Sequence, residues 1–404
     1  MLKKILKSYD YSLVVVVILL AVFGLIMIYS ASMVTAIQRY GYESDHFFDR
    51  QRIYLLASAL AFIFFAIVPY KMYLNNKILV PLVVLLLGAL MGVLAFGTVA
   101  GNAQSWYQIG PVRLQPAEFV KIGIIVYLSA VYAKKQPYIN EFNKGVLPPL
   151  VLLVLVCFFI ALQPDYGTAL LIVLISGSII LSSGMNLKNI VKLISLGIVL
   201  SIPAILILKD HIFSETRLER FQVLSNPFAE EIAQTSGYHL VNSFLALGAG
   251  GLKGLGLGQS IQKLGYLPEP HTDFIMAIIA EELGVLGVLF VLCSLGYIVL
   301  KGIYIGLKGK DPFGSLLAIG IASMIGIQSF VNLAGISGLI PLTGVPLPFL
   351  SYGGSSLLQL SISMGILVNV SMFINYEKKY KNKENKEVQS TISGNNNSTY
   401  YLRK

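Results

Sequence analysis

Ten long apolar runs divide this chain, and runs of that length strongly limit its possible folds. Crossing about 30 Å of hydrocarbon takes roughly 20 mostly apolar residues in a helix. Hydrophobic residues make up 55% of the sequence and charged residues only 12%, which is too few for a soluble domain of 404 residues. The sequence therefore predicts an all-α, polytopic membrane protein with ten transmembrane helices, at residues 11–32, 53–69, 78–98, 116–133, 147–163, 168–184, 190–208, 273–300, 314–334 and 354–374.

The distribution of lysine and arginine predicts which side of the membrane each loop faces. With both termini in the cytoplasm, cytoplasmic segments hold 20 of the 30 basic residues and the other side holds nine, as the positive-inside rule requires. Membrane anchoring then explains the formal charge of +10, and no nucleic-acid partner is expected. Residues 1–376 form one membrane domain, with a large extracytoplasmic loop at 209–272, and the polar residues 377–404 form a disordered cytoplasmic tail.

Three titratable residues crowd together where the long loop meets the eighth apolar run. Glu269, His271 and Asp273 lie within the sequence Tyr-Leu-Pro-Glu-Pro-His-Thr-Asp at 266–273. An acid at the start of a helix can serve a purely structural role. The alternative is proton transfer, for which such a density of titratable groups is suited. Further along the same run, Glu281 and Glu282 must face the bundle interior or a wet cavity, because charges facing lipid are costly.

Other polar residues interrupt the fourth run and the turn before the sixth. Glu118 and Lys121 are three residues apart and share one face of a helix that begins near Pro116. They form either a structural ion pair or a site in which Lys121 binds an anionic lipid headgroup while Glu118 holds it in place. Asp165 is either a turn or capping residue of the next helix or, if the fold brings it near Asp273, part of the same site.

The segment 335–356 is apolar but contains five glycines and three prolines, so it cannot form a regular helix. Irregular backbone at membrane depth is tolerated only where protein buries it or where it lines a cavity. We therefore expect a re-entrant or capping loop. The adjacent glycines 353 and 354 would let backbone N–H groups approach an anion beside Ser355, although the same residues can serve only as a turn.

Together these segments resemble the SEDS family (shape, elongation, division and sporulation), the FtsW/RodA/SpoVE polytopic proteins of bacterial cell-wall synthesis. The similarity runs from residue 10 to about residue 375, and its most specific pieces are residues 115–118, 163–167, 266–275 with 281–284, and 344–356. The resemblance implies a peptidoglycan glycosyltransferase that polymerises lipid II at the outer face of the cytoplasmic membrane. Asp273 matches the catalytic acidic residue of the family, and Glu118 and Lys121 match its functional pair in the fourth span. One departure is Ser105, because family members commonly have arginine before the tryptophan that is Trp106 here.

The implied chemistry assigns roles to the candidate residues. A sugar 4-hydroxyl must attack an anomeric carbon while a lipid diphosphate departs, so Asp273 would act as the general base. The departing diphosphate needs cations where charge develops. The sequence contains no cluster that suggests a metal centre, although a divalent cation such as Mg²⁺ would suit the diphosphate. The candidate substrate-binding residues are Glu118, Lys121, Asp165, Arg217, Arg220, Lys253, Lys263, His271 and Ser355.

Partners and alternatives follow from the same resemblance. It implies a class B penicillin-binding protein and other divisome proteins as partners, and the sequence at residues 8–12 with the chain length favours a division member at the septum. Two other functions stay open. A transporter that flips lipid II would need the same cations but no base, and a scaffold that recruits a transpeptidase would need only its spans.

Overall fold

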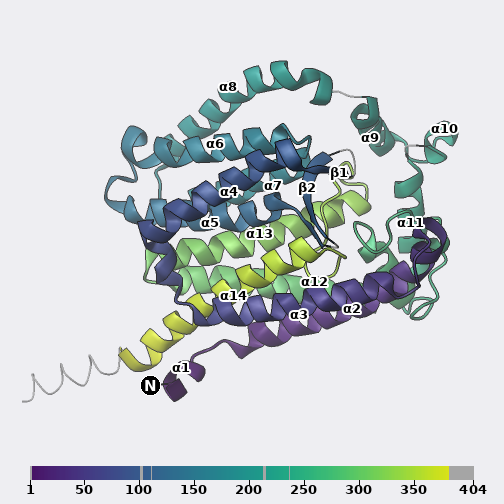
Figure 1. The fold of residues 1–404 in the computed structure, drawn as a ribbon, viewed down its shortest axis with the longest axis horizontal. Helices are drawn as coiled ribbons and strands as arrows, with labels where there is room; N and C mark the ends of the chain where they lie inside the picture. Colours follow the sequence, from purple (N-terminus) through teal and green to yellow (C-terminus); the bar gives the residue numbers. More distant parts are fainter. Residues whose placement is uncertain (1, 101–102, 111, 213–214, 236, 382–404) are drawn as a thin grey trace, which may run out of the picture.

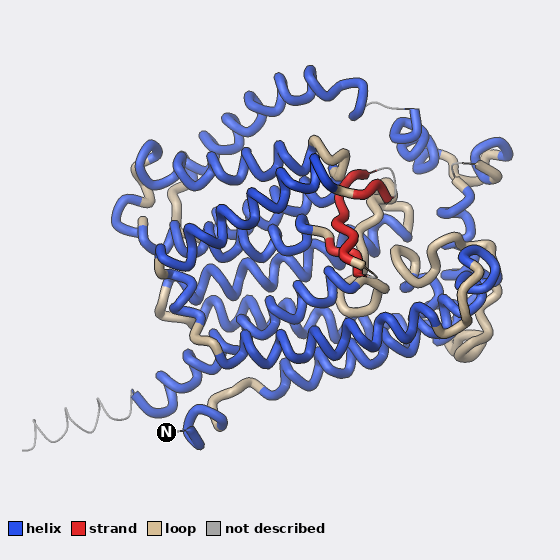
Figure 2. Tube along the Cα trace, in the orientation of Figure 1, coloured by secondary structure: helices blue, strands red, loops and turns tan. Residues whose placement is uncertain are grey.

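The computed structural model describes residues 2–100, 103–110, 112–212, 215–235 and 237–381. Within this part of the chain, long helices pack side by side in a bundle, and most of the irregular chain gathers at one end of it (Figures 1 and 2). The expected all-α, polytopic fold is confirmed. Each predicted apolar run falls on a helix: α2 Tyr11–Tyr40, α3 His46–Ile67, α4 Asn76–Phe96, α5 Pro116–Lys134, α6 Leu147–Ala161, α7 Tyr166–Ser182, α8 Leu187–Ile212, α12 Ile275–Lys308, α13 Pro312–Ile336 and α14 Gly354–Tyr376.

Eight of the helices in the described ranges are long and apolar enough to cross a membrane. The eight do not include α7, which has 17 residues, or α8, which has 26 and lies along the edge of the bundle in Figure 1. Ten crossings therefore stay a prediction. Two helices run eight residues past their predicted ends: α12 continues to Lys308 instead of residue 300, and α2 continues to Tyr40 instead of residue 32. Helix α2 stops where Gly41 adopts a left-handed conformation with φ 65°.

The two ends of the described chain lie together. Lys379 Nζ on η5 (Glu377–Lys381) donates a hydrogen bond to the Lys7 carbonyl oxygen at 2.9 Å, and Asn375 Nδ2 donates one to the Ser8 carbonyl oxygen at 3.2 Å. The short α1 (Leu2–Leu6) therefore sits beside the end of α14 (Figure 1). Two chain ends that lie at the same end of the bundle agree with an even number of membrane crossings. The predicted disordered tail, from residue 382 onward, lies outside the described residues.

The opposite end of the bundle contains structure that the sequence pattern did not predict. A small antiparallel sheet with the order β1-β2-β3 is formed by Thr98–Ala100, Ala103–Ile109 and Val112–Leu114. The predicted loop 209–272 is partly helical, because it contains the end of α8 and the helices α9 (Glu215–Ser225), α10 (Glu230–Ala233) and α11 (Tyr238–Gly250). The short helices η1 (Tyr70–Leu74), η2 (Gln136–Tyr138), η3 (Phe142–Val146) and η4 (Gln262–Leu264) complete the connections.

Helices α5, α13 and α14 form the centre of the bundle. Protein buries 78%, 67% and 78% of the residues in their most apolar stretches, against at most 33% in the other candidate spans. The polar side chains on these three helices are therefore enclosed by protein, whereas lipid would face most of the remaining helices. Because polar groups in hydrocarbon are costly, the centre of the bundle is where functional polar residues can reside.

Helix α12 is broken near its start by Gly284, whose φ of 61° lies in the left-handed region. The segment after α11 inserts at the break: Leu255 N donates to the Glu281 carbonyl oxygen and Gly256 N to that of Glu282, both at 2.9 Å. Val285 N in turn donates to a backbone oxygen of that segment at 3.1 Å. These bonds satisfy backbone groups that the break releases from the helix, which membrane depth requires.

Candidate functional site

Asp273 lies two residues before the start of α12 and is half-buried. In the described part of the chain, no group donates a hydrogen bond to its carboxylate. Burial raises the pKa of this carboxyl to about 6, the charge of Glu269 adds to the increase, and Arg220 opposes it. A methyl group placed on Gly344 would lie 3.6 Å from Asp273 Oδ2, so the carboxylate faces the backbone of the irregular segment 337–353. This carboxylate can accept a proton near neutral pH.

The segment leading to Asp273 is fixed to the end of α2. Arg39 donates a hydrogen bond to the Pro268 carbonyl oxygen at 2.6 Å and forms an ion pair with Glu269 at 3.2 Å. Tyr40 donates a hydrogen bond to Glu269 Oε1 at 3.0 Å. The last eight residues of α2, which exceed the predicted span, therefore serve as a support for this segment. The Glu269 carboxylate is consequently engaged by Arg39 and Tyr40.

His271 is buried against aromatic rings. Its ring centre lies 4.3 Å from that of Phe47 on α3 and 5.6 Å from that of Tyr352. Burial lowers the pKa of His271 to about 4, with a smaller contribution from Arg39, so the ring is neutral at pH 7. His271 therefore packs and orients the segment before Asp273, and the geometry gives no support to its predicted contact with substrate.

The irregular segment 337–353 binds the backbone of residues 271–272. Tyr352 N donates a hydrogen bond to the His271 carbonyl oxygen at 2.8 Å. Ser351 Oγ donates one to the Thr272 carbonyl oxygen at 2.7 Å and accepts one from Leu347 N, also at 2.7 Å. The prediction of an irregular segment here is confirmed, and its physical role is to hold the chain that presents Asp273.

Glu118 and Lys121 are both buried on α5, in the centre of the bundle. Lys121 Nζ lies 2.9 Å from Glu118 Oε1 and donates a second hydrogen bond, of 3.1 Å, to Gln328 Oε1 on α13. The other Glu118 oxygen, Oε2, is buried and has no hydrogen-bond partner in the described part of the chain. The predicted pairing is confirmed. The unpartnered oxygen and the third donor position of the ammonium leave polar capacity for a ligand.

Asp165 caps the N-terminus of α7, as the structural alternative predicted. Its carboxylate accepts hydrogen bonds from Thr168 N at 3.1 Å and Thr168 Oγ1 at 2.9 Å. Gln115 Nε2, at the start of α5, donates a third at 3.0 Å. Burial raises the pKa of Asp165, and the charges of Glu118 and Lys121 also act on it, so this cap lies next to that ion pair.

Ser355, in the first turn of α14, is buried and joins two segments instead of facing an open cavity. Its Oγ donates a hydrogen bond to the Arg113 carbonyl oxygen on β3 at 3.2 Å and accepts one from Gln115 N at 3.1 Å. With its donor and one acceptor position used, Ser355 connects the sheet to the start of α5. These contacts give Ser355 a structural role, and its predicted contact with substrate stays a prediction.

The predicted cations separate into different places. Arg220 on α9 is exposed, donates a hydrogen bond to the Leu342 carbonyl oxygen at 2.9 Å, and influences the Asp273 carboxyl. Lys253 is exposed on the segment after α11. Arg217 lies on α9, and its side chain is outside the described structure. Lys263 is buried, forms an ion pair with Glu282 Oε1 at 2.7 Å and donates a hydrogen bond to Ser30 Oγ at 3.0 Å, so it joins η4 to α12 and α2, and its predicted contact with substrate stays a prediction.

Two cations that the sequence indicated only as outer charges lie at the same end of the bundle. Burial, followed by the effect of Tyr54, raises the pKa of Tyr352 to about 12, while Arg50 and Arg113 oppose the increase. Arg50 is on α3 and Arg113 on β3. Both therefore lie beside the segment 337–353. Their proximity depends on the sheet and on the position of α3, neither of which a local motif reveals.

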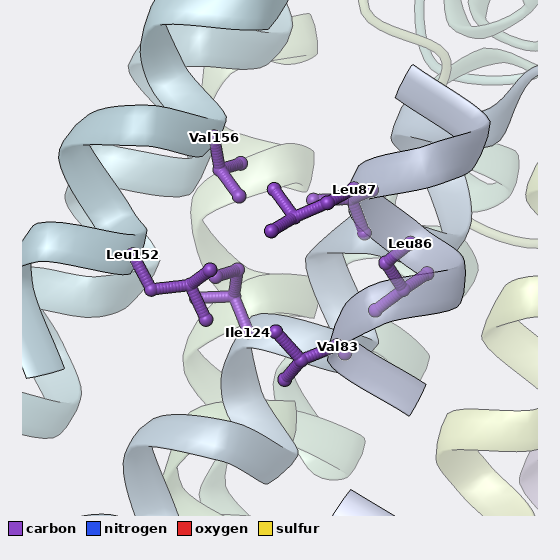
Figure 3. A pocket seen from close by; sticks show the side chains of 8 residues that line it. Val83, Leu86, Leu87, Ile124, Leu152 and Val156 are labelled. Carbon is purple, nitrogen blue, oxygen red and sulfur yellow. The ribbon is translucent and has the colours of Figure 1, made fainter. Parts of the chain in front are cut away.

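Two hollows in the described structure lie away from Asp273 and from Lys121. The first is a void of about 10 Å³ between α4, α5 and α6 (Figure 3), lined by the apolar residues Val83, Leu86, Leu87, Val120, Gly123, Ile124, Leu152 and Val156. A void of this size and apolarity holds no ordered water. The second is an open hollow of about 440 Å³ at the start of α3, lined by Tyr29, Asp45, Phe48, Asp49 and Arg52. Neither includes Asp273 or Lys121.

A family-wide profile described as "Cell cycle protein", FtsW/RodA/SpoVE, matches residues 10–376. The chain belongs to this family. It is 55% identical to the probable peptidoglycan glycosyltransferase FtsW of Bacillus subtilis (strain 168), over 95% of this chain and 96% of that protein. It is 38% identical to the stage V sporulation protein E of the same strain, over 91% of this chain and 98% of that protein.

Solved structures of FtsW/RodA/SpoVE-type proteins share the fold. A chain of the structure described as "Structural coordination of polymerization and crosslinking by a peptidoglycan synthase complex" aligns with a TM-score of 0.70 at 23% identity, covering 91% of this chain and 98% of that one. The rod shape determining protein RodA of Thermus thermophilus aligns with a TM-score of 0.64 at 24% identity, covering 90% and 96%. These alignments confirm the polytopic fold.

The family departure at Ser105 has a structural counterpart. Ser105 is buried in β2, and its hydroxyl has no partner in the described part of the chain, so this position does not present a polar group outward. On the neighbouring strand, Arg113 is exposed and pairs in register with Gln108. Arg113 is therefore the residue of this sheet that can supply a cation at the site.

Proposed function

We propose that this chain is a peptidoglycan glycosyltransferase that polymerises lipid II at the outer face of the cytoplasmic membrane, with Asp273 as the general base. The observation that carries the proposal is the Asp273 carboxylate, which is half-buried, has a raised pKa, and receives no hydrogen bond within the described residues. A carboxylate held in this way is suited to take a proton from a hydroxyl. The name of the FtsW relative in Bacillus subtilis supports the same reaction.

The reaction is a single displacement. The 4-hydroxyl oxygen of the acceptor sugar forms a bond to the anomeric carbon of the donor, and its proton passes to Asp273. The bond between the anomeric carbon and the diphosphate oxygen breaks, and the diphosphate leaves with the bonding electrons. One displacement inverts an α-linked donor into a β-linked product, so the enzyme needs no nucleophilic side chain.

The leaving diphosphate requires positive charge near the oxygen on which charge develops. Lys121 is the central candidate, because Glu118 holds its ammonium in a fixed position at the centre of the bundle. Arg50, Arg113 and Arg220 supply further positive charge at the end of the bundle that holds Asp273. Buried, pre-oriented cations stabilise a developing anion more strongly than cations in water.

A divalent cation stays a separate expectation. Within the described ranges, no group of three His, Cys, Asp or Glu side chains is arranged to hold a metal ion. Mg²⁺ in phosphate chemistry is commonly held by one or two carboxylates together with the substrate phosphates. Asp273 or the free Glu118 oxygen would be the available protein ligand, and the ion would neutralise charge on the leaving diphosphate.

The proposal includes a cellular setting. We place both termini in the cytoplasm and the protein at the division septum, together with a class B penicillin-binding protein and other divisome proteins. The distribution of basic residues supports the orientation, and the identity to an FtsW relative supports the division role. The structural relative comes from a peptidoglycan synthase complex, which supports a partner for this chain as well.

The test is polymerisation of purified lipid II by the full chain in the presence of the partner. Asp273→Asn should reduce the rate by about 10²–10⁴-fold, the usual contribution of a general base. The control is Asp311→Asn at the start of α13, where the carboxylate accepts a hydrogen bond from Gly314 N at 3.1 Å. Asparagine is an equally good N-cap, so this variant should keep its activity and stability.

Three outcomes would contradict the proposal. Asp273→Asn with most of the wild-type rate would remove the base assignment and favour a structural role. A wild-type protein that moves lipid II across a vesicle membrane without forming glycan would favour the transporter. A protein that does neither, yet recruits the transpeptidase, would favour the scaffold.

A further inference from the structure

Two amide side chains, Gln328 and Asn332, lie one helical turn apart on α13. Both are buried, with 0% and 4% of their surface exposed, and residues four apart on a helix share a face. An amide removed from water is costly unless it is hydrogen-bonded. Their presence on a central membrane helix therefore requires hydrogen-bond partners. Those partners include Lys121 on one side and the backbone beside Asp273 on the other.

Gln328 uses both ends of its amide. Its Oε1 accepts a hydrogen bond of 3.1 Å from Lys121 Nζ, and its Nε2 donates one of 3.0 Å to the Pro346 carbonyl oxygen. One side chain therefore contacts the proposed diphosphate-binding cation and the irregular segment 337–353 together. An amide can accept and donate in this way, whereas a lysine ammonium can only donate and an ionised carboxylate can only accept.

Asn332 makes the equivalent connection one turn further. Its Nδ2 donates to the Val345 carbonyl oxygen at 2.8 Å and to the Asp273 carbonyl oxygen at 2.9 Å. The two amides thus bind the consecutive carbonyls of residues 345 and 346. Residues 341–347 have no regular secondary structure, so these side-chain bonds replace the backbone bonds that would fix a helix or strand.

The held backbone is the part of the segment that faces the carboxylate. A methyl group on Gly344 would lie 3.6 Å from Asp273 Oδ2 and would meet no other non-adjacent atom within 4 Å in the described part of the chain. The position of this backbone next to the carboxylate is set by the bonds of the next two residues to α13. A shift of about 1 Å in a reacting group can lower a rate on the order of 10²-fold.

We propose that Gln328 and Asn332 are positioning residues that fix the Asp273 carboxylate relative to the Lys121 ammonium through the backbone of residues 344–346. This inference rests on the proposed function, since it gives the two amides a role in the same reaction. Neither amide acts on substrate. Both hold the base and the cation at the separation that the donor and acceptor sugars require.

The chain offers a matched control in Asn369 on α14. This asparagine is also fully buried, accepts a hydrogen bond from Tyr70 N at 2.9 Å, and donates one to the Ala66 carbonyl oxygen at 2.6 Å. Its contacts lie on the connection between α3 and η1 and do not reach the segment 337–353. Replacing Asn369 therefore removes two buried hydrogen bonds without touching the site.

The experiment compares Asn332→Leu, Gln328→Met and the control Asn369→Leu in the full chain, because these apolar replacements keep side-chain volume. Lipid II polymerisation gives kcat and KM, and hydrogen–deuterium exchange gives the protection of backbone amides in 266–274 and 337–353. We expect kcat to fall on the order of 10–10²-fold in the first two variants with KM changed by less than about threefold. Exchange should increase in both segments. The control should match wild type in both measurements once stability is taken into account.

The outcomes separate the two proposals. Unchanged exchange in both segments for Asn332→Leu would overturn the positioning role whatever the enzyme does. Increased exchange with normal kcat would overturn it too, as would an equal loss of kcat in Asn369→Leu. By contrast, an inactive wild-type protein or a fully active Asp273→Asn would reject the proposed function itself.

Discussion

At the scale of single residues, two aspartates that precede helices have opposite environments. Asp165 accepts three hydrogen bonds, two of them from Thr168, and behaves as a helix cap. Asp273 receives none within the described residues, and the capping position of α12 is taken by Phe274. The sequence allowed both a structural role and a functional role for each of these aspartates. The structure separates them, because an acid with no donors retains its capacity to accept a proton.

The first prediction concerns pH. Because the pKa of Asp273 is about 6, the polymerisation rate should fall as pH drops through 6, with about a tenfold loss for each further unit. His271 should not contribute to this limb, since its pKa is about 4. The measurement is kcat/KM between pH 5 and 8. A rate that stays constant down to pH 5 would mean that another group accepts the proton.

The same pKa predicts a stability effect that does not depend on activity. A carboxyl whose pKa is higher in the folded state binds more protons there than in the unfolded state between about pH 4 and 6. Stability from this group is therefore lost as pH rises through that window. Asp273→Asn removes this pH-dependent loss of stability. The melting temperature of the variant minus that of the wild type should therefore be larger at pH 7 than at pH 4.5. A decrease would indicate that the carboxylate stabilises the fold.

At the scale of elements, the sequence predicted the long helices well and their ends only in part. Apolar runs set the helices because hydrocarbon demands them, and Pro116 correctly marked the start of α5. The sheet at 98–114 was missed because its short strands are stabilised by pairing and by contacts with distant segments. The break at Gly284 was missed because its backbone partners come from another segment, about thirty residues earlier.

The break in α12 is surrounded by buried charges. Glu282, 0% exposed, accepts hydrogen bonds from Ser30 Oγ at 2.7 Å and Lys263 Nζ at 2.7 Å. Glu281 accepts one from Ile261 N at 2.9 Å and another from the Ser260 hydroxyl. The sequence correctly placed both glutamates toward the protein interior. Their role is to bind the segment before Asp273 to α12.

A third prediction follows from this arrangement. Lys263→Met should lower the free energy of unfolding by about 3–5 kcal/mol, because it leaves Glu282 as an unpaired buried charge. The double variant with Glu282→Gln should recover much of that loss, since no unpaired charge remains. Thermal unfolding of the purified protein measures both. If Lys263→Met reduced polymerisation without lowering stability, Lys263 would instead be a substrate contact.

At the scale of the whole molecule, the candidate site combines segments that are far apart in the sequence. Sequence reasoning found Glu118, Lys121 and Asp273 because charged residues stand out in apolar surroundings. It missed the amides of α13 because uncharged polar residues are frequent in membrane helices and carry no local signal. Arg50 and Arg113 were counted only as outer charges, since their proximity to Tyr352 depends on how α3 and the sheet pack.

The final prediction tests the orientation of the molecule, on which the proposed function depends. Lipid II presented outside the cell can reach Asp273 only if the end of the bundle with the sheet faces outward. Gln259→Cys and Lys310→Cys, each in a chain with Cys157→Ala and Cys293→Ala, place one exposed thiol at each end. A membrane-impermeant thiol reagent should label the cysteine at 259 in intact cells and the one at 310 only after the membrane is opened. The reverse pattern would place Asp273 in the cytoplasm, where it could not polymerise lipid II presented outside.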